Sequence, residues 1–231
     1  MIDWERIWRG SGVVAIVLLV IGSVIYGYGN QPKLGASDAK LVSFFDGDRT
    51  RILIATVFFC FAFLEQLWFG AALASVLRDA GKGGWANAAT AASAALGALL
   101  FVNITLNAAL AYSIAGSGSP ELASGLNDLS WVLVVLSFFP AAMLVMSGSF
   151  GLWRAGIFSN TAFAAGVSAM AVLLAGTTTW ASDGFWAADG AYSGLVAPIV
   201  ALAWVAVVSA FLSRKSPSTA ITSNRAAVHA A

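Results

Sequence analysis

The stretch ILIATVFFCFAFLEQLWFGAALASVL, residues 52–77, decides the fold of this chain. The run carries one charged side chain, Glu65, and arginines flank it at positions 51 and 78. A helix needs about 20 consecutive, predominantly apolar residues to cross a bilayer. Residues 52–77 therefore predict a transmembrane helix, and they place Glu65 near its middle.

Five further apolar runs have the same character: residues 13–28, 86–115, 130–150, 161–180 and 195–212. Backbone groups in hydrocarbon are satisfied only inside a helix or a closed barrel, and these runs are too long and too weakly alternating for barrel strands. The sequence thus predicts an all-α fold, a polytopic membrane protein in which residues 1–215 form a six-transmembrane-helix bundle. Residues 216–231 are small and polar, and they predict a disordered cytoplasmic tail.

The composition agrees with lipid as the main solvent of the chain. Of its 231 residues, 59% are hydrophobic and 10% are charged, whereas soluble domains carry about 25% charged residues. The net charge of +1, without any basic run, argues against a nucleic-acid partner.

Cysteine and histidine, on which several classes of membrane enzyme depend, are scarce in this sequence. The chain holds one cysteine, Cys60, and one histidine, His229, so it predicts no disulfide framework, no metal site, and no haem or other cofactor. Nucleotide-binding loops, serine-nucleophile elbows and zinc motifs are also lacking. We therefore expect no enzymatic activity and no catalytic residue.

Lysines and arginines predict the orientation, because they concentrate on the cytoplasmic side of membrane proteins. With the N-terminus inside, the inner segments hold eight of them: Arg6, Arg9, Arg78, Lys82, Arg154, Arg214, Lys215 and Arg225. The outer segments hold four: Lys33, Lys40, Arg49 and Arg51. Both termini are therefore predicted to be cytoplasmic (N-in/C-in), with residues 29–51, 117–129 and 182–194 outside. In the first of these segments, Ser37 is expected to cap a short helix that lies on the outer membrane surface.

Glu65 is the one charged residue deep inside a predicted span, where an ionised carboxylate costs about 3 kcal/mol on insertion scales. Asn103 and Asn107 are four residues apart, so they share one face of the next predicted helix, and Asn103 lies at nearly the depth of Glu65. Together with Gln66, these residues form a candidate polar site that binds a proton, a cation or a small polar solute. The alternative is that the four side chains only hydrogen-bond across helices and hold the bundle together.

Three segments of the chain resemble a group of uncharacterised six-span membrane proteins common in actinobacteria. They are ASDAKLVSFFDGDRTRILIA (36–55), WFGAALASVLRDAG (68–81) and LNDLSWVLVVLSFFPAAMLVMSGSFGLWRAG (126–156). The matching positions are Phe44, Phe45, Arg49 and Arg51; Trp68, Phe69, Leu73, Leu77 and Arg78; and Asp128, Trp131, Phe139 and Pro140. The resemblance implies six helices in a bacterial plasma membrane and carries over no catalytic residue.

Two functions are compatible with these observations. One is a transporter component for small solutes or ions, with Glu65 as its protonatable centre. The other is a non-catalytic structural or accessory membrane protein that acts through protein partners or as an oligomer.

A short sequence similarity links LRDAG (77–81) with LWRAG (152–156). It leaves two interpretations open, a parallel repeat or a chance recurrence at two turns.

Overall fold

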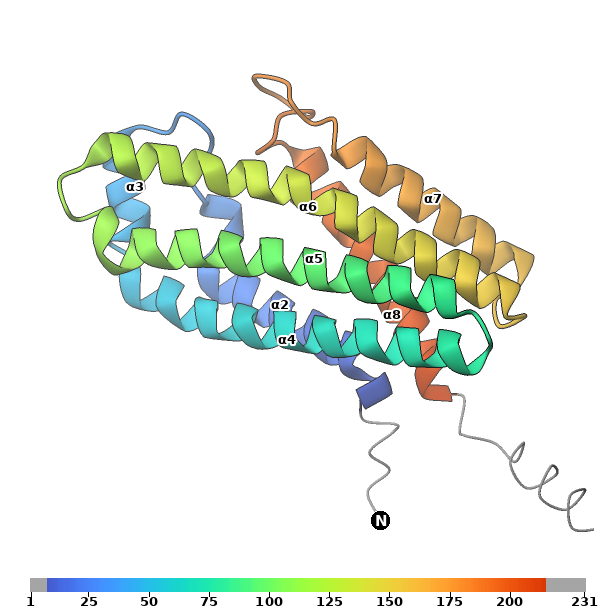
Figure 1. Cartoon of the computed structure of the whole chain (residues 1–231). Helices are drawn as coiled ribbons and strands as arrows, with labels where there is room; N and C mark the ends of the chain where they lie inside the picture. Colours follow the sequence, from blue (N-terminus) through green and yellow to red (C-terminus); the bar gives the residue numbers. More distant parts are fainter. Residues whose placement is uncertain (1–7, 215–231) are drawn as a thin grey trace, which may run out of the picture.

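The structure, a computed structural model, describes residues 8–214, and the regular elements in that range are helices (Figure 1). The α-helices are α2 (Ser11–Tyr26), α3 (Asp38–Phe45), α4 (Arg49–Asp79), α5 (Gly83–Ala109), α6 (Pro120–Arg154), α7 (Asn160–Gly176) and α8 (Ala197–Arg214). A 3-10 turn follows α2 at Tyr28–Asn30, and π-helical turns lie at Leu110–Ile114 and Tyr192–Val196. The predicted all-α fold is confirmed. The predicted tail, residues 216–231, lies outside the described residues.

Each of the six predicted apolar runs falls on one helix, but the helices differ in length. Four are long and apolar enough to cross a membrane: α4, α5 with its π-helical turn, α6, and α8 with the turn before it. The apolar helices α2 and α7 are shorter, with 16 and 17 residues. At 1.5 Å per residue, 16 residues reach about 24 Å, which is less than the roughly 30 Å of a hydrocarbon core. By length and composition, the structure therefore supports four spanning helices.

The start of α6 corrects one predicted boundary. The helix begins at Pro120 and not near residue 130, so most of the segment predicted as the outer loop 117–129 is helical. Pro120 occupies the first turn, where its fixed φ suits a helix and its missing N–H costs nothing. Glu121 adds a negative charge to the positive end of the helix dipole. The apolar run begins later than the helix because these first turns are polar.

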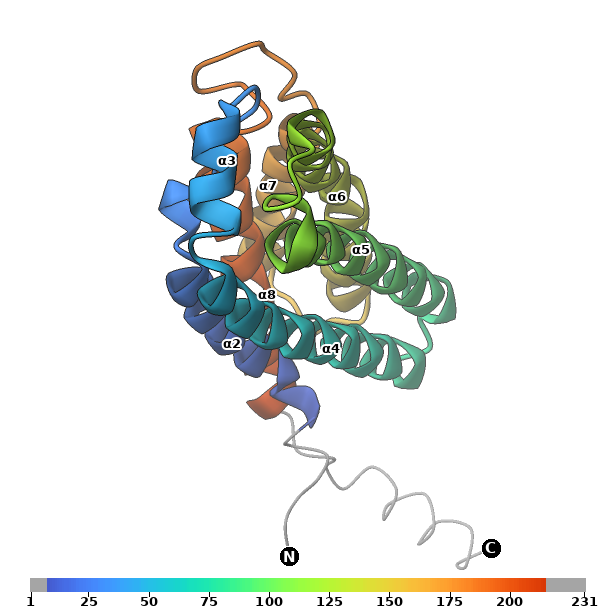
Figure 2. The same ribbon diagram turned by 90° about the vertical axis from the view of Figure 1, so that its left-hand side faces the viewer.

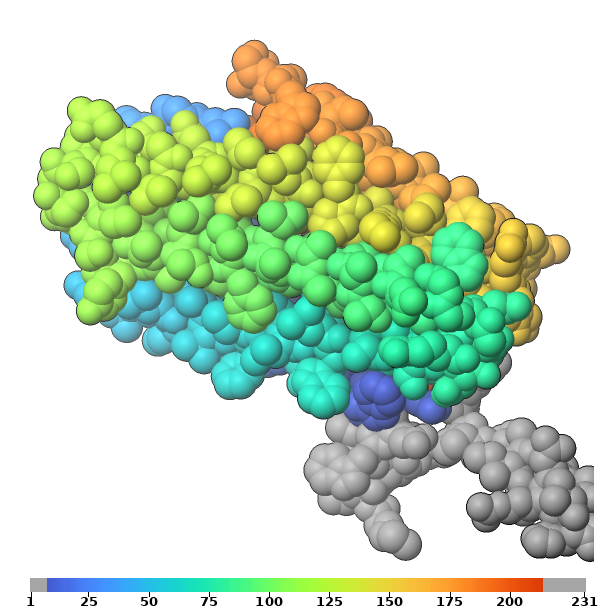
Figure 3. Space-filling model, viewed as in Figure 1, coloured from blue at the N-terminus to red at the C-terminus, as the bar shows by residue number. Residues whose placement is uncertain are grey.

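The helices pack in sequence order, α2 beside α4, α4 beside α5, α5 beside α6 and α6 beside α7, and α8 returns to contact both α2 and α7 (Figures 1 and 2). Ser209 Oγ of α8 donates a hydrogen bond of 3.1 Å to the carbonyl of Arg9, just before α2. The start of α2 and the end of α8 therefore meet at one end of the bundle, the terminus end. The opposite end is the loop end. Figure 3 shows α4, α5 and α6 in contact along their length on one face.

The short helix α3 closes the loop end of the bundle. Ser37 stands at its N-cap position, as predicted, although its side chain makes no capping hydrogen bond. Leu41, Phe44 and Phe45 share one face of α3, and all three are buried in the core of the loop end. The predicted helix is thus confirmed, but its apolar face packs on the protein and not on lipid.

Small residues let a large aromatic side chain, Trp204 of α8, enter the core of the terminus end. Its Nε1 donates a hydrogen bond of 3.0 Å to Ser149 Oγ of α6. A Cβ at Gly148 would lie 2.7 Å from the Trp204 ring, and one at Gly166 would collide with the Ser149 side chain. These glycines therefore allow α6, α7 and α8 to approach closely, as small residues do in membrane helix pairs.

The sequence similarity between LRDAG and LWRAG has a local structural cause. Gly81 and Gly156 both adopt left-handed backbone conformations, with φ of 72° and 68°. The residue after each glycine donates its N–H to a carbonyl five residues back, Lys82 to Leu77 at 2.8 Å and Ile157 to Leu152 at 2.9 Å. This is the Schellman ending of an α-helix, for which glycine is preferred. The two segments are alike because α4 and α6 end in the same way.

Candidate functional site

Asn103 and Asn107 come together on α5, as the sequence predicts, and they link three helices. Asn107 is 3% exposed, and its Nδ2 donates to the carbonyl of Asn103 at 2.9 Å. The hydroxyl of Tyr26, at the end of α2, donates to Asn107 Oδ1 at 2.8 Å. On the other side, Asn103 Nδ2 donates to the carbonyl of Ser130 in α6 at 2.6 Å. This polar chain runs from α2 through α5 to α6.

Sequence reasoning missed Tyr26 as a partner of the asparagines. Tyr26 lies near the end of the first predicted span, where a tyrosine is typical of the membrane interface. Its ring instead packs edge-on against Phe44 and Phe59, with centroid distances of 5.5 and 5.9 Å. A tyrosine at a span end, level with an asparagine of another span, was the signal that could have indicated this bond.

Gln66 lies on the side of α4 that faces α5, but it has a different partner. Its Nε2 donates to Ser93 Oγ at 3.1 Å, and a Cβ at Gly97 would lie 3.7 Å from its Oε1. That buried Oε1 accepts no hydrogen bond from the residues described. From Gly97 to Asn103 is about 9 Å along the helix, at 1.5 Å per residue. Gln66 therefore lies nearly two helical turns away from the asparagines.

Glu65 is turned toward a different neighbour, α2. Successive residues of an α-helix are rotated by about 100°, so Glu65 does not share the Gln66 face. It shares its face with Phe58 and Phe69, seven residues before and four after it. A Cβ at Gly22 would lie 3.3 Å from Phe58, and one at Gly12 would lie 2.8 Å from the Phe69 ring. Because both glycines belong to α2, Glu65 lies on the α2 side of α4, away from α5.

The carboxylate of Glu65 is half-buried at this seam between α2 and α4. Among residues 8–214 it makes no hydrogen bond and no ion pair. The four predicted site residues are thus divided: Asn103 and Asn107 belong to one hydrogen-bonded chain, Gln66 pairs with Ser93, and Glu65 stands alone. A ligand-binding role for any of them stays a prediction.

A second set of polar contacts holds the loop between α2 and α3, residues 31–36, which we call the strap. Its carbonyls accept hydrogen bonds from Asn127 Nδ2 at 3.2 Å and from Trp131 Nε1 at 2.9 Å. Its N–H groups donate to Asp128 Oδ1 at 3.3 Å and to Asp189 Oδ2 at 2.9 Å. The polar residues early in α6, together with Asp189 between α7 and α8, therefore fix the strap across the loop end.

The fold and these sites define an all-α protein whose apolar helices suit a lipid bilayer. Within residues 8–214, no three His, Cys, Asp or Glu side chains gather as a metal site would require. No protein-family profile matches the chain, and neither a curated protein nor a solved structure is similar to it.

Proposed function

We propose that this chain is an accessory subunit of a bacterial plasma membrane complex, with six spans and both termini in the cytoplasm, and that Glu65 binds a helix of its partner. The observation that carries the proposal is the half-buried, unpaired carboxylate of Glu65 at the seam of α2 and α4. The start of α2 and the end of α8 meet at the terminus end, which supports an even number of crossings. Membership of the actinobacterial group stays a prediction.

The physical argument concerns the cost of that carboxylate. An ionised acid at the centre of a bilayer costs about 3 kcal/mol on insertion scales, and such groups pair with another charge or face a wet cavity. The residues one turn away on either side, Phe61 and Trp68, are each 56% exposed, so the surface beside Glu65 is open and apolar. A partner helix with a lysine or arginine at the same depth would cover this surface and neutralise the acid.

The same unpaired carboxylate favours a second candidate function, proton- or cation-coupled transport. In that case Glu65 binds and releases the ion, and it does so without the asparagines, whose hydrogen bonds join helices to one another. The two functions differ in what they require. The accessory function requires a partner chain, whereas the transport function requires flux through the isolated protein.

The test compares wild type with Glu65→Leu and Glu65→Gln, with Glu121→Gln as the control. Glu121 is an exposed acid at the start of α6, far in sequence from the seam. The proteins are extracted from host membranes in mild detergent, and the intact complexes are weighed by native mass spectrometry. We expect the wild type and the control to hold a stoichiometric partner with a basic residue in a span, and Glu65→Leu to lose it.

The partner's basic residue provides a reciprocal check. Glu65→Lys should abolish binding, and an acid in place of the partner's basic residue should restore it. A complex that survives Glu65→Leu contradicts the accessory function. Ion flux in liposomes containing only this chain, lost in Glu65→Gln, would establish the transport function instead.

A further inference from the structure

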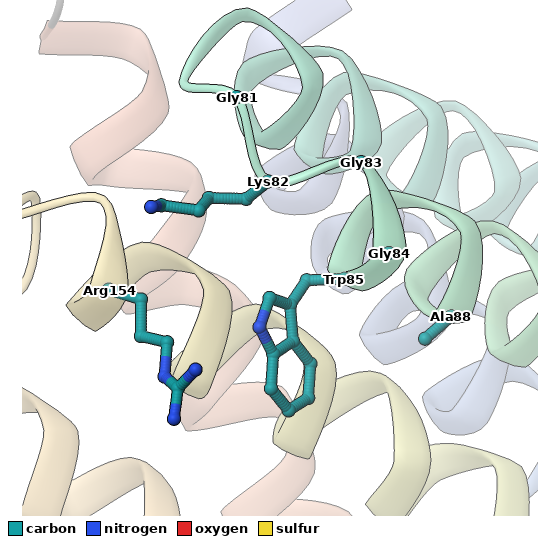
Figure 4. Close-up of a pocket in the computed structure, with 7 residues that line it drawn as sticks. All are labelled: Gly81, Lys82, Gly83, Gly84, Trp85, Ala88 and Arg154. Carbon is teal, nitrogen blue, oxygen red and sulfur yellow. The ribbon is translucent and has the colours of Figure 1, made fainter.

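An open pocket lies at the terminus end, between the start of α5 and the end of α6 (Figure 4). It measures about 490 Å³ and is lined by residues 81–85, by Ala88 and by Arg154. Its walls are the terminal residues of two helices that are long and apolar enough to cross a membrane, Gly83–Ile114 and Pro120–Arg154. A pocket at the ends of two spanning helices lies at the depth of lipid headgroups.

Two cationic side chains reach this pocket from different helix turns. Lys82 precedes α5 and Arg154 ends α6; the Arg154 side chain runs beside the indole of Trp85, and the Lys82 side chain extends towards the end of α6 (Figure 4). Neither cation makes an ion pair or a side-chain hydrogen bond among the described residues. No acidic side chain lines the pocket. Its lining therefore carries two positive charges that no residue between positions 8 and 214 pairs with.

The backbone adds donors to the same pocket. The first helical hydrogen bond of α5 runs from Ala86 N to the carbonyl of Lys82, at 3.0 Å. The N–H groups just before it, at positions 83 to 85, have no acceptor within their own helix. Nothing lies within 4 Å of a Cβ built at Gly83 or at Gly84, so an anion can approach these groups. The positive end of the helix dipole favours such an anion.

A row of stacked aromatic rings beside the pocket marks the depth of the membrane interface. Trp85 stacks on Phe150 with centroids 5.6 Å apart, Phe150 meets Phe163 edge-on at 4.9 Å, and Phe163 stacks on Trp153 at 4.6 Å. Tryptophans with an apolar body and one polar N–H are enriched where acyl chains give way to headgroups. The row therefore places hydrocarbon next to the two cations.

We propose that this pocket binds the phosphate of an anionic phospholipid, with Lys82 and Arg154 as its charged contacts. The phosphate accepts hydrogen bonds from both cations and from the free N–H groups at the start of α5. The acyl chains then run along the aromatic row. Free phosphate offers the same headgroup chemistry without the chains, so the aromatic row favours the lipid. The proposal is independent of Glu65 and of any partner.

The experiment measures lipid binding to the full chain by native mass spectrometry and by lipid-dependent shifts in Tm. The probes are phosphatidylglycerol, phosphatidylcholine and inorganic phosphate. The variants are wild type, the double variant Lys82→Gln with Arg154→Gln, and the control Arg78→Gln. Arg78 is a good control because it is an exposed cation at the same end that lies outside the pocket.

Each cation near an anionic surface strengthens binding by about fivefold, so the double variant should bind phosphatidylglycerol roughly 25-fold more weakly than wild type. Phosphatidylcholine has the same phosphate but no net charge, so its binding should weaken less than that of phosphatidylglycerol. Arg78→Gln should stay within about fivefold of wild type. Equal phosphatidylglycerol binding by the double variant and by Arg78→Gln would overturn the proposal. Binding of inorganic phosphate as tightly as phosphatidylglycerol would overturn the lipid as its source. Because the two side chains are at the surface, the Tm without lipid should be the same in all variants.

Discussion

Removing the hydrogen bond between Tyr26 and Asn107 tests how α2 is held to the bundle. The change Tyr26→Phe keeps the ring and its edge-on contacts with Phe44 and Phe59. It removes only the hydroxyl that donates to Asn107 Oδ1 at 2.8 Å. Since Asn107 is 3% exposed, water has little access to the oxygen that would be left without its donor.

Two magnitudes bound the expected loss. A buried acceptor left without its donor costs about 1–3 kcal/mol. Hydrogen bonds between membrane helices are worth about 0.6 kcal/mol on average and at most about 1.7 kcal/mol. We therefore expect Tyr26→Phe to lower the free energy of unfolding by about 1–1.5 kcal/mol. In an Asn107→Ala background, where the acceptor is absent, the same change should cost less than about 0.5 kcal/mol.

The assay is reversible unfolding in mixed micelles of mild detergent and dodecyl sulfate, followed by circular dichroism. Tyr112→Phe is the matched control, because it also removes a tyrosine hydroxyl but from a residue that is 63% exposed. The centroid of the Tyr112 ring lies 5.0 Å from the guanidinium carbon of Arg49. The control should stay within about 0.5 kcal/mol of wild type. If Tyr26→Phe costs the same whether or not Asn107 is present, the hydrogen bond does not join α2 to α5.

Three further outcomes follow from the packing and the topology. Gly148→Val should lower the free energy of unfolding by about 1–3 kcal/mol in the same micelles, because a Cβ at this position meets the buried indole of Trp204 in α8. A stability equal to that of wild type would contradict this contact. Trp131→Phe should lower the free energy of unfolding by about 1 kcal/mol and speed amide hydrogen exchange in the strap, because the Nε1 donor is lost. An unchanged exchange rate would show that this hydrogen bond does not hold the strap. In a cysteine-free background, a thiol at Ser119 should react with an impermeant reagent in intact cells and one at Asp79 should not; the reverse pattern would invert the orientation.

The helices of this bundle were predictable because each apolar run is long and sharply bounded. The start of α6 was not, because Asn127 and Asp128 interrupt the apolar pattern and look like loop residues. Their side chains are polar for a tertiary reason, since they bond to the strap, a segment about ninety positions away in sequence. Local periodicity cannot show a partner at that distance.

The candidate site was predictable only in part, for a similar reason. The four-residue spacing of Asn103 and Asn107 indicated their shared face correctly. The direction of Glu65 depends on which helix packs against each side of α4. Gly12 and Gly22 determine which side of α4 faces α2, because they leave room for the aromatic rings of α4. Those glycines look ordinary in the sequence of an apolar helix.

The strap also sets an order of events during synthesis. Its bond from Leu34 to Asp189 joins residues 155 positions apart. At ribosomal rates of about 5–20 residues per second, the acceptor emerges on the order of ten seconds after the donor. Through that interval the first helix pair is already made while its connecting loop still lacks this partner. The strap can therefore bond to α6 first, and its last hydrogen bond forms only after α7 and Asp189 have been made.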